Sequence, residues 1–203
     1  MRPAQIAVWG ALLLGIGCKE RSQPRPPDGL AAQAVPTHVD SFVPREVALE
    51  RFRKGSSPIQ TLAGGAPSRD ALVRGFLHAL ETRDTTALRR LVVSRDEFAW
   101  IYYPTSPQGL PPYSLNPDLM WFMLVQQGNR GASRAFRDLG GRQLDLAGYR
   151  CAEKVREGAN TLWGNCLVRW RQEAQADTMS ARLFGPILER GGRYKFLSYA
   201  NKL

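Results

Sequence analysis

One cluster of side chains has the composition of a proton-transfer site. Asp96 and Glu97 are followed shortly by the adjacent pair Tyr102 and Tyr103. An apolar pocket raises the pKa of a carboxyl group, which suits it to general acid or base catalysis, and a tyrosine hydroxyl can stabilise an oxyanion. A structural alternative exists, because Ser94 and Glu97 have the spacing of a capping box and Asp96 lies where acids favour the helix dipole. The candidate catalytic residues are therefore Asp96, Tyr102 and Tyr103, and the capping interpretation competes with them.

Three tryptophans are candidates for the lining of a ligand pocket. Trp100, Trp121 and Trp170 are large aromatic residues that can surround an apolar molecule, although such residues more commonly fill a core. The chain has no phosphate-binding glycine loop, dinucleotide fingerprint, paired-histidine zinc motif or calcium loop. We therefore expect no cofactor and no metal, and a role without catalysis is favoured over an enzymatic one.

Cys151 and Cys166 are placed to form a disulfide. The segment that contains them has strand-like flanks around a turn, in which Gly158 suits the first central position of a tight hairpin. If Gly158 and Ala159 form a two-residue loop, the two cysteines stand directly opposite each other, near disulfide geometry. The sequence predicts this disulfide, and the alternative is a pair of buried thiols. A zinc site is not expected, because two cysteines without further clustered ligands do not fill a tetrahedral shell.

The third cysteine, Cys18, ends a segment with the layout of an export signal. Arg2 precedes an apolar run over residues 6–16, and the cysteine follows shortly after it. The run is shorter than the roughly 20 residues that a membrane-spanning helix needs. Residues 1–18 resemble the signal peptide and lipobox of bacterial lipoproteins, although the family usually has leucine where this chain has Gly15.

The resemblance to lipoproteins implies where the protein is located. It implies that residues 1–17 are removed and that Cys18 receives acyl chains, palmitate among them, whose lasting attachment to a lipid bilayer needs two or more chains. The alternative is an ordinary secretory signal with a coincidental cysteine. Lys19, in place of aspartate after the lipid site, resembles lipoproteins that are forwarded to an outer membrane. We expect an exported, lipid-anchored protein of the cell envelope, on the outer membrane facing the periplasm if the cell is Gram-negative.

Composition divides the rest of the chain into a tether, residues 18–40, and a single domain, residues 41–203. The tether contains four prolines and few large apolar residues, so it is expected to be disordered and semi-extended. The whole chain has a net charge of +10, yet its basic residues are scattered and form no nucleic-acid-binding motif. Nucleic acid is therefore not an expected partner. The surplus predicts a solvated arginine-rich surface, with binding to an anionic membrane surface as the alternative.

Helical periodicity dominates the first half of the domain. Helices are predicted over residues 43–54 and over residues 69–83, the second of which has Ser68 as its N-cap. Asp84 can cap a third helix that extends to Leu91 and Val92.

Two further helices are predicted around a proline-rich loop. The capping box at Ser94 starts a helix that should end before Pro104. The loop follows over residues 104–116, and Asn116 with the next proline marks the start of a buried helix. The glycines of residues 128–131 are expected to break that helix.

From residue 142 onward the apolar pattern changes to a period of two, which is typical of strands. The side chains predicted to share one face of a strand over residues 161–171 are Leu162, Cys166, Val168 and Trp170. A second hairpin is predicted over residues 177–199, with its turn at Gly191 and Gly192 and a bend at Gly185 and Pro186.

N-terminal helices followed by a curved antiparallel sheet define an α+β fold class. The run ALVRGFLHALETRDTTALRRLVV, the capped short helix after it and the C-terminal strands together resemble the NTF2-like superfamily, also called the SnoaL-like or cystatin-like roll, over residues 68–200. The resemblance implies helices packed on a cupped sheet around a conical cavity. That superfamily includes ketosteroid isomerases with a tyrosine and a carboxylate in the pocket, as well as proteins without catalysis, so the fold does not decide the function.

Two functional hypotheses follow. The first is a membrane-tethered envelope lipoprotein whose domain is a structural module or binds a small apolar ligand or another envelope protein. The second is an isomerase or dehydratase in which Asp96 opens into a cavity beside Tyr102 or Tyr103. The first hypothesis is favoured, because no catalytic motif accompanies the predicted signal and tether.

Overall fold

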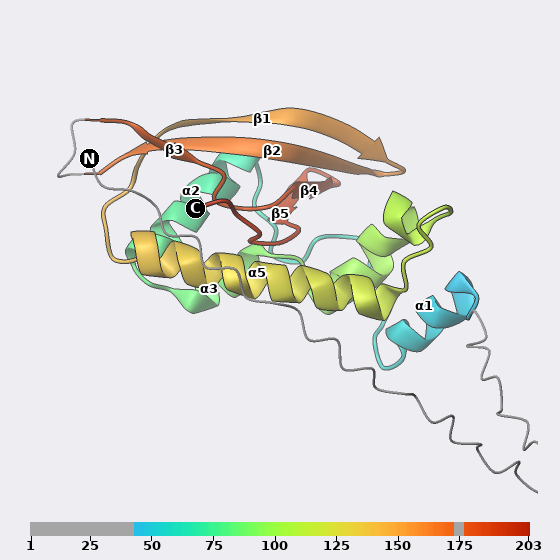
Figure 1. The fold of residues 1–203 in the computed structure, drawn as a ribbon. Helices are drawn as coiled ribbons and strands as arrows, with labels where there is room; N and C mark the ends of the chain where they lie inside the picture. The colour runs from blue at the N-terminus through green and yellow to red at the C-terminus, as the bar shows by residue number, and fades with distance from the viewer. Residues whose placement is uncertain (1–42, 173–176) are drawn as a thin grey trace, which may run out of the picture. The chain divides into compact units, whose positions relative to one another are not determined.

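The computed structural model describes residues 43–172 and 177–203, which have the predicted α+β fold. The predicted signal segment, Cys18 and the tether lie outside these residues. The helices of the described part are α1 (Arg45–Arg53), α2 (Arg69–Glu81), α3 (Thr85–Leu91), α4 (Arg95–Glu97) and α5 (Pro117–Leu139). Its strands are β1 (Asp145–Glu157), β2 (Asn160–Arg171), β3 (Met179–Ala181), β4 (Ile187–Arg190) and β5 (Arg193–Phe196). Figure 1 shows α2 and α5 on the same side of the long β1–β2 ribbon.

The sheet is antiparallel and is ordered β1-β2-β4-β5. The strands β3 and β4 pair with different halves of β2, since β3 lies beside residues 168–170 and β4 beside residues 160–163. The predicted interruption at Gly185 and Pro186 separates these two strands, and the glycine pair Gly191 and Gly192 forms the turn between β4 and β5.

The β1–β2 hairpin has the predicted register. Glu157 pairs with Asn160 across the loop formed by Gly158 and Ala159, and Cys151 pairs with Cys166. The two cysteines form a disulfide with an S–S distance of 2.02 Å. The two cysteines are therefore placed as a disulfide requires, in the register that the sequence predicts.

The predicted face of β2 is partly wrong. Cys166, like Val168 and Trp170, lies in the main hydrophobic core, but Leu162 packs against a second core, and its neighbour Trp163 contacts the main one. The reason lies at Asn165, whose φ of 51° places it in the left-handed region. A strand residue in this conformation interrupts the regular alternation of side chains. After Asn165 the even-numbered residues face the main core, whereas before it the odd-numbered Trp163 does.

The predicted N-caps are present. Ser68 accepts a hydrogen bond from the backbone N–H of Ala71, and Asp84 accepts one from that of Ala87. Ser94 and Glu97 form the reciprocal capping box at the start of α4. These caps satisfy N–H groups that have no partner within their own helix.

The chain after α4 differs from the predicted helix. Instead of ending before Pro104, it continues as a π-helical turn (Phe98–Tyr102) and then a short 3-10 turn (Tyr103–Thr105) that includes the proline. The buried side-chain amide of Asn160 donates hydrogen bonds to the Ile101 carbonyl and to the Thr105 hydroxyl. The turn of the β1–β2 hairpin therefore holds this irregular segment in place.

The expected break in α5 is wrong, because the helix continues through residues 128–131 to Leu139. A Cβ atom on Gly131 would lie 1.6 Å from the carbonyl oxygen of Tyr199, and one on Gly128 would lie 3.5 Å from the Tyr199 amide nitrogen. The glycines therefore do not end the helix. They let the C-terminal segment cross it in direct backbone contact.

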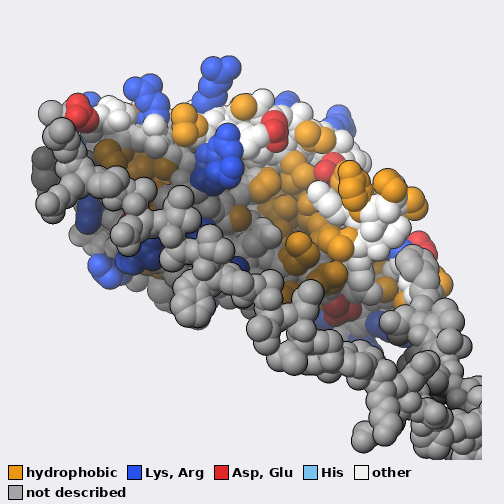
Figure 2. Space-filling view, in the orientation of Figure 1, with side chains coloured by type: hydrophobic (Ala, Val, Ile, Leu, Met, Phe, Trp, Pro, Cys, Tyr) orange, Lys and Arg blue, Asp and Glu red, His pale blue; other side chains and the backbone are white. Residues whose placement is uncertain are grey.

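Two hydrophobic cores occupy opposite faces of the β4–β5 hairpin. Ile187 and Phe196 face the main core with α2, whereas Leu188 faces the second core with the Phe98–Tyr102 turn. The inner face of the sheet is thus filled by the protein's own side chains. On the outer surface, Figure 2 shows Lys and Arg side chains spread along the sheet and hydrophobic side chains gathered toward the N-terminal end of α5.

Candidate functional site

An apolar groove opens between α3 and α5 in the described part, and we call it the α3–α5 groove. Its volume is about 490 Å³. One wall is a helical face of α3, formed by Thr85, Leu88, Arg89 and Val92. The other wall is a face of α5, formed by Trp121, Leu124, Val125, Gly128, Asn129, Ala132, Ser133 and Phe136. Val93, Ser94 and Arg95 continue the first wall, and Leu197, Ser198 and Tyr199 form the floor.

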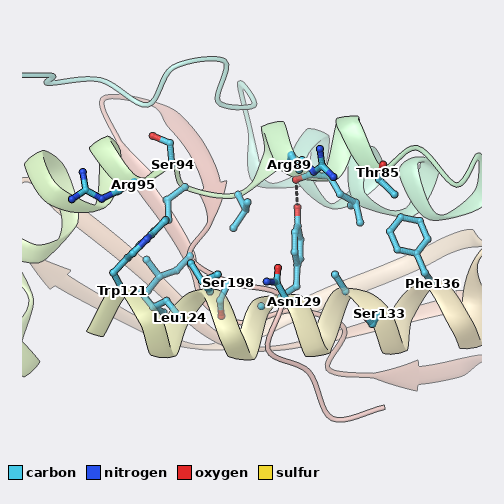
Figure 3. Close-up of a pocket in the computed structure, with 18 residues that line it drawn as sticks. Thr85, Arg89, Ser94, Arg95, Trp121, Leu124, Asn129, Ser133, Phe136 and Ser198 are labelled. Atoms are coloured by element: carbon cyan, nitrogen blue, oxygen red, sulfur yellow. Dashed lines mark hydrogen bonds between the residues drawn. The ribbon is translucent and has the colours of Figure 1, made fainter. Parts of the chain in front are cut away.

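The floor is fixed by contacts at Tyr199. Its hydroxyl donates a 2.6 Å hydrogen bond to the Leu88 carbonyl, which the dashed line in Figure 3 marks. Burial raises the pKa of Tyr199, so the hydroxyl remains a donor at physiological pH. Asn201 follows the floor and donates to the Gly131 carbonyl at 2.7 Å. The C-terminal segment is thereby bonded to α3 on one side and to α5 on the other.

The lining is mostly apolar, and its charged groups are arginines. It contains Arg89 and Arg95 and no Asp, Glu or His. Arg95 is engaged elsewhere, because its guanidinium stacks 4.1 Å from the Phe52 ring centroid and donates to the Phe52 carbonyl. Arg89 is exposed, and its side chain makes no hydrogen bond, ion pair or ring contact within the described part of the chain. Figure 3 shows it on the wall opposite Asn129.

The candidate catalytic residues are not brought into this groove. Tyr103 is buried and donates its hydroxyl to the Leu115 carbonyl at 2.7 Å, which holds the proline-rich loop. Tyr102 is buried beside Gln108, at an O–O distance of 3.5 Å, and Asp96 is half-buried at the start of α4. None of Asp96, Tyr102 and Tyr103 lines the groove. The α3–α5 groove therefore does not bring the three candidate catalytic residues together.

Of the three candidate pocket tryptophans, only Trp121 lines the groove. Trp170 is 2% exposed and lies in the main core, away from the lining of the groove. Trp100 lies outside the groove as well. Its ring stacks 3.9 Å from the Arg53 guanidinium carbon, and its Nε1 donates to Ser56. Trp170 thus fills the core, whereas Trp100 borders a different opening, of about 840 Å³, beside α1.

Glu97 has a structural role beyond the capping box. Its side chain is 1% exposed and forms a 2.9 Å ion pair with Lys195, whose side chain is 6% exposed. The carboxylate also accepts hydrogen bonds from the backbone N–H groups of Ala63 and Ser94. A buried charge needs such pairing to offset its loss of hydration. Glu97 therefore joins α4 to β5 and has no oxygen free for catalysis.

Sequence reasoning missed one carboxyl group, that of Glu157 at the β1–β2 turn. Burial raises its pKa, and its Oε2 is buried without a hydrogen-bond partner in the described structure. Its charge contributes to the raised pKa of Tyr102, behind burial as the main cause. Because a glutamate beside a turn commonly faces solvent, no sequence signal distinguished it. The carboxyl does not line the groove.

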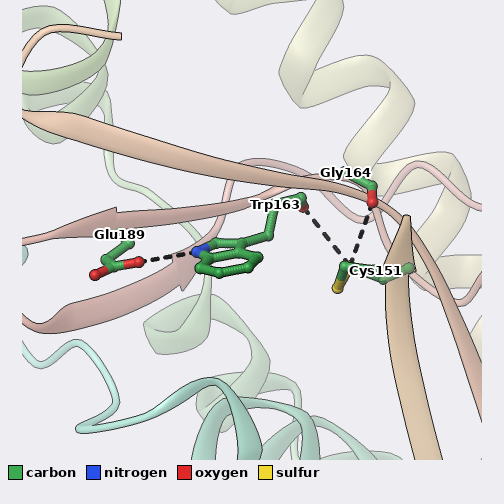
Figure 4. The surroundings of a disulfide bond; sticks show 5 residues. Cys151, Trp163, Gly164 and Glu189 are labelled. Carbon is green, nitrogen blue, oxygen red and sulfur yellow. Dashed lines mark hydrogen bonds between the residues drawn. A yellow bond between two sulfur atoms is a disulfide. The ribbon is translucent and has the colours of Figure 1, made fainter. Parts of the chain in front are cut away.

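The surroundings of the disulfide form a packed structural site, shown in Figure 4. The Sγ atom of Cys166 lies 3.6 Å from the Trp163 carbonyl oxygen, a contact without a shared proton, since a bonded sulfur carries none. The Trp163 indole donates to Glu189 at 2.9 Å and stacks 3.6 Å from the guanidinium carbon of Arg69. These interactions hold β2 to β4 and α2. Cys166 also borders a small pocket of about 250 Å³, which is separate from the α3–α5 groove.

The chain matches no known protein family, no curated protein and no solved structure. The resemblances to bacterial lipoproteins and to the NTF2-like superfamily therefore remain predictions. Among the described residues, no group of three or more His, Cys, Asp or Glu side chains could hold a metal ion. None of the helices described here has the length and apolar character that crossing a membrane requires.

Proposed function

We propose that this protein is exported, is anchored to the cell envelope through acylated Cys18, and binds a small apolar ligand in the α3–α5 groove. The groove is the observation that supports the binding role. Ligand sites typically have volumes of about 300–1,000 Å³, an apolar lining and a small number of polar groups. A volume of about 490 Å³, with Asn129, Ser133 and Arg89 among mostly apolar side chains, falls in this class.

Two features support export and anchoring. The first is the layout of residues 1–18, with a short apolar run that ends before Cys18. The second is the disulfide between Cys151 and Cys166, because disulfides form and persist in oxidising compartments outside the cytosol.

Binding fits this groove better than catalysis does. Its lining has no Asp, Glu or His that could act as a general base. The charged side chains of the lining are Arg89 and Arg95, whose guanidinium groups are hydrogen-bond donors that can hold an anion and do not serve as general bases. No observation favours a second function in the same place.

A neutral, environment-sensitive naphthylamine dye tests the binding role on the full chain with Cys18→Ser, which removes the proposed acylation site. We expect the dye to brighten on binding. The substitution Ala132→Trp should abolish the signal, because it fills the groove from the α5 wall. The matched control is Gln127→Trp, which adds the same ring on an exposed part of α5 outside the lining. Equal dye binding in both tryptophan variants would reject the groove as the ligand site.

The anchor has an independent test. Intact-mass measurement of the mature wild-type protein should find a chain that begins at Cys18 and carries acyl groups. The Cys18→Ser variant should lose both the added mass and the membrane association. A mature wild-type chain that begins at another residue, or begins at Cys18 without acyl groups, would contradict the anchoring proposal and leave the binding proposal untouched.

A further inference from the structure

The groove is long and narrow. Along α5 its lining extends from Trp121 to Phe136, fifteen residues, which corresponds to about 22 Å at a rise of about 1.5 Å per residue. The volume open to the centres of water molecules, divided by this length, gives a mean cross-section of about 22 Å² and a width of about 5 Å. Adding the diameter of a water molecule, about 2.8 Å, makes the groove about 8 Å wide. An α-helix with its side chains is about 10–12 Å wide, so a partner helix does not enter the groove.

An extended peptide is also a poor occupant. The walls are helices α3 and α5, whose backbone groups are bonded within each helix, so they offer no ladder of free donors and acceptors. A peptide buried between them would leave its own N–H and C=O groups without partners, at a cost for each group. A hydrocarbon chain has no such groups and matches the apolar lining.

The charge of the groove indicates which head group a ligand with a hydrocarbon tail would carry. Arg89 is the cation of the lining that has no partner in the described part, and no acid lines the groove to neutralise it. Asn129 stands on the opposite wall (Figure 3), and its side-chain amide adds N–H donors to the lining. Arginine recognises carboxylates and phosphates through paired N–H donors.

We infer that the α3–α5 groove binds a single-chain anionic amphiphile of the fatty acid class, with its head group between Arg89 and Asn129 and its tail toward Trp121. This inference rests on the proposed function, since it names the ligand class of that groove. The distance along α5 from Asn129 to Trp121 is about 12 Å, which is the length available to the tail. The tails of membrane lipids span about 15 Å, half of the ~30 Å hydrocarbon core of a bilayer, so they are slightly longer. A tail of medium length fills that part of the groove.

Displacement of the naphthylamine dye by paired ligands tests the inference on the Cys18→Ser chain. Dodecanoate and dodecanol have the same tail and differ in head-group charge. We expect dodecanoate to bind more tightly, and Arg89→Gln to weaken it by about threefold to tenfold while leaving dodecanol unchanged. Arg90→Gln is the matched control, because Arg90 is an exposed neighbour on α3 outside the lining.

Tail length gives a second measurement. Each added methylene should tighten carboxylate binding by up to about fourfold until the tail reaches Trp121, after which the affinity should level off. Trp121→Ala should shift this plateau toward longer tails, because it opens the end of the groove.

The outcomes separate the two proposals. If the dye binds in the groove but dodecanoate and dodecanol compete equally, the inference is overturned and the proposed function stands. The same holds if Arg89→Gln and Arg90→Gln have equal effects. If no dye binds at all, both proposals fail. If the acylated wild-type chain excludes the dye and the Cys18→Ser chain admits it, the groove holds the protein's own acyl chain, and the inference of a free amphiphile is overturned.

Discussion

Replacing Gly131 by alanine tests how the C-terminal segment builds the floor of the groove. The added methyl group would lie 1.6 Å from the Tyr199 carbonyl oxygen and 2.5 Å from its carbonyl carbon. Both atoms belong to the backbone, so no side-chain rotation relieves the clash. Either α5 or the segment around Tyr199 must move away.

The expected loss of stability follows from the contacts that this movement breaks. Moving the segment weakens the hydrogen bond from Tyr199 to Leu88 and the one from Asn201 to the Gly131 carbonyl. Overpacking costs about 1–3 kcal/mol and each buried hydrogen bond about 1 kcal/mol, whereas alanine in place of glycine in a helix contributes about 1 kcal/mol. The net prediction for Gly131→Ala is a loss of about 3 kcal/mol.

Gly75→Ala is a matched control within the same protein. Gly75 also lies inside a helix, α2, but its added methyl would meet only the Leu91 side chain at 3.6 Å, an ordinary contact. The substitution should therefore stabilise the protein by about 0.5–1 kcal/mol through helix propensity alone. The two identical substitutions are predicted to have opposite signs.

Thermal and urea unfolding measure both variants. A change of 1 kcal/mol shifts the Tm of a chain of this size by about 2–4 °C, so Gly131→Ala should lower it by roughly 10 °C and Gly75→Ala should raise it slightly. Gly131→Ala should also lose dye binding in the groove, because the floor moves. A Gly131→Ala protein that is as stable as Gly75→Ala would refute the close crossing of Tyr199 over α5.

Three further predictions concern the cores and the hairpin. Replacing both Cys151 and Cys166 by alanine should cost about 3 kcal/mol in urea unfolding, and a reductant should then have no additional effect on the variant. Lys195→Met should cost about 3–5 kcal/mol because it leaves the Glu97 carboxylate buried and unpaired, and adding Glu97→Gln should recover part of that loss. Glu157→Gln should be more stable than the wild type at neutral pH. The raised pKa of Glu157 means that its protonated form favours folding, so the wild type has this contribution below the ordinary glutamate pKa of about 4.3 and loses it as the pH rises through the folded-state value. The Tm values of the wild type and Glu157→Gln should therefore differ at neutral pH and become equal at acid pH. A Tm difference that does not change with pH would contradict the assignment to the Glu157 carboxyl group.

Local features of the fold were predictable because each depends on a few neighbouring residues. The cap at Ser68 and the capping box from Ser94 to Glu97 need only a hydroxyl or carboxylate at a fixed distance from free N–H groups. The opposition of Cys151 and Cys166 needs only the position of a two-residue turn. These features could therefore be predicted from the sequence without knowledge of the tertiary structure.

Features that depend on distant contacts were not predictable. The glycines at 128 and 131 are local signals for ending a helix, and only the crossing of Tyr199, about seventy residues later, explains why the helix continues. The left-handed conformation of Asn165 inverts the faces of β2, and period-two reasoning has no means of finding such a residue within a strand.

The candidate site was predictable only in part for the same reason. The aromatic candidates were chosen by size, and size alone does not separate Trp121 in the groove from Trp170 in the core. The groove requires α3, α5 and the C-terminal segment to meet, and these elements are far apart in the sequence. Arg89 is one of many arginines, and its significance depends on a three-dimensional fact, which is that no acid shares the groove lining with it.

The position of the groove predicts that the proposed ligand would stabilise the whole domain. Two lining residues belong to the main core, where Leu88 is buried and Phe136 packs against it. Two others belong to the second core, where Leu197 is buried and Trp121 packs against it. A ligand that extends along α5 therefore contacts side chains that pack into both cores. Because it binds only the folded chain, it should stabilise the protein by about 2.7 kcal/mol at a concentration one hundred times its Kd. Leu197 and Tyr199 are neighbours in the floor that pack into different cores, so the stabilisation should appear as one cooperative shift of the unfolding transition and not as protection of α3 alone.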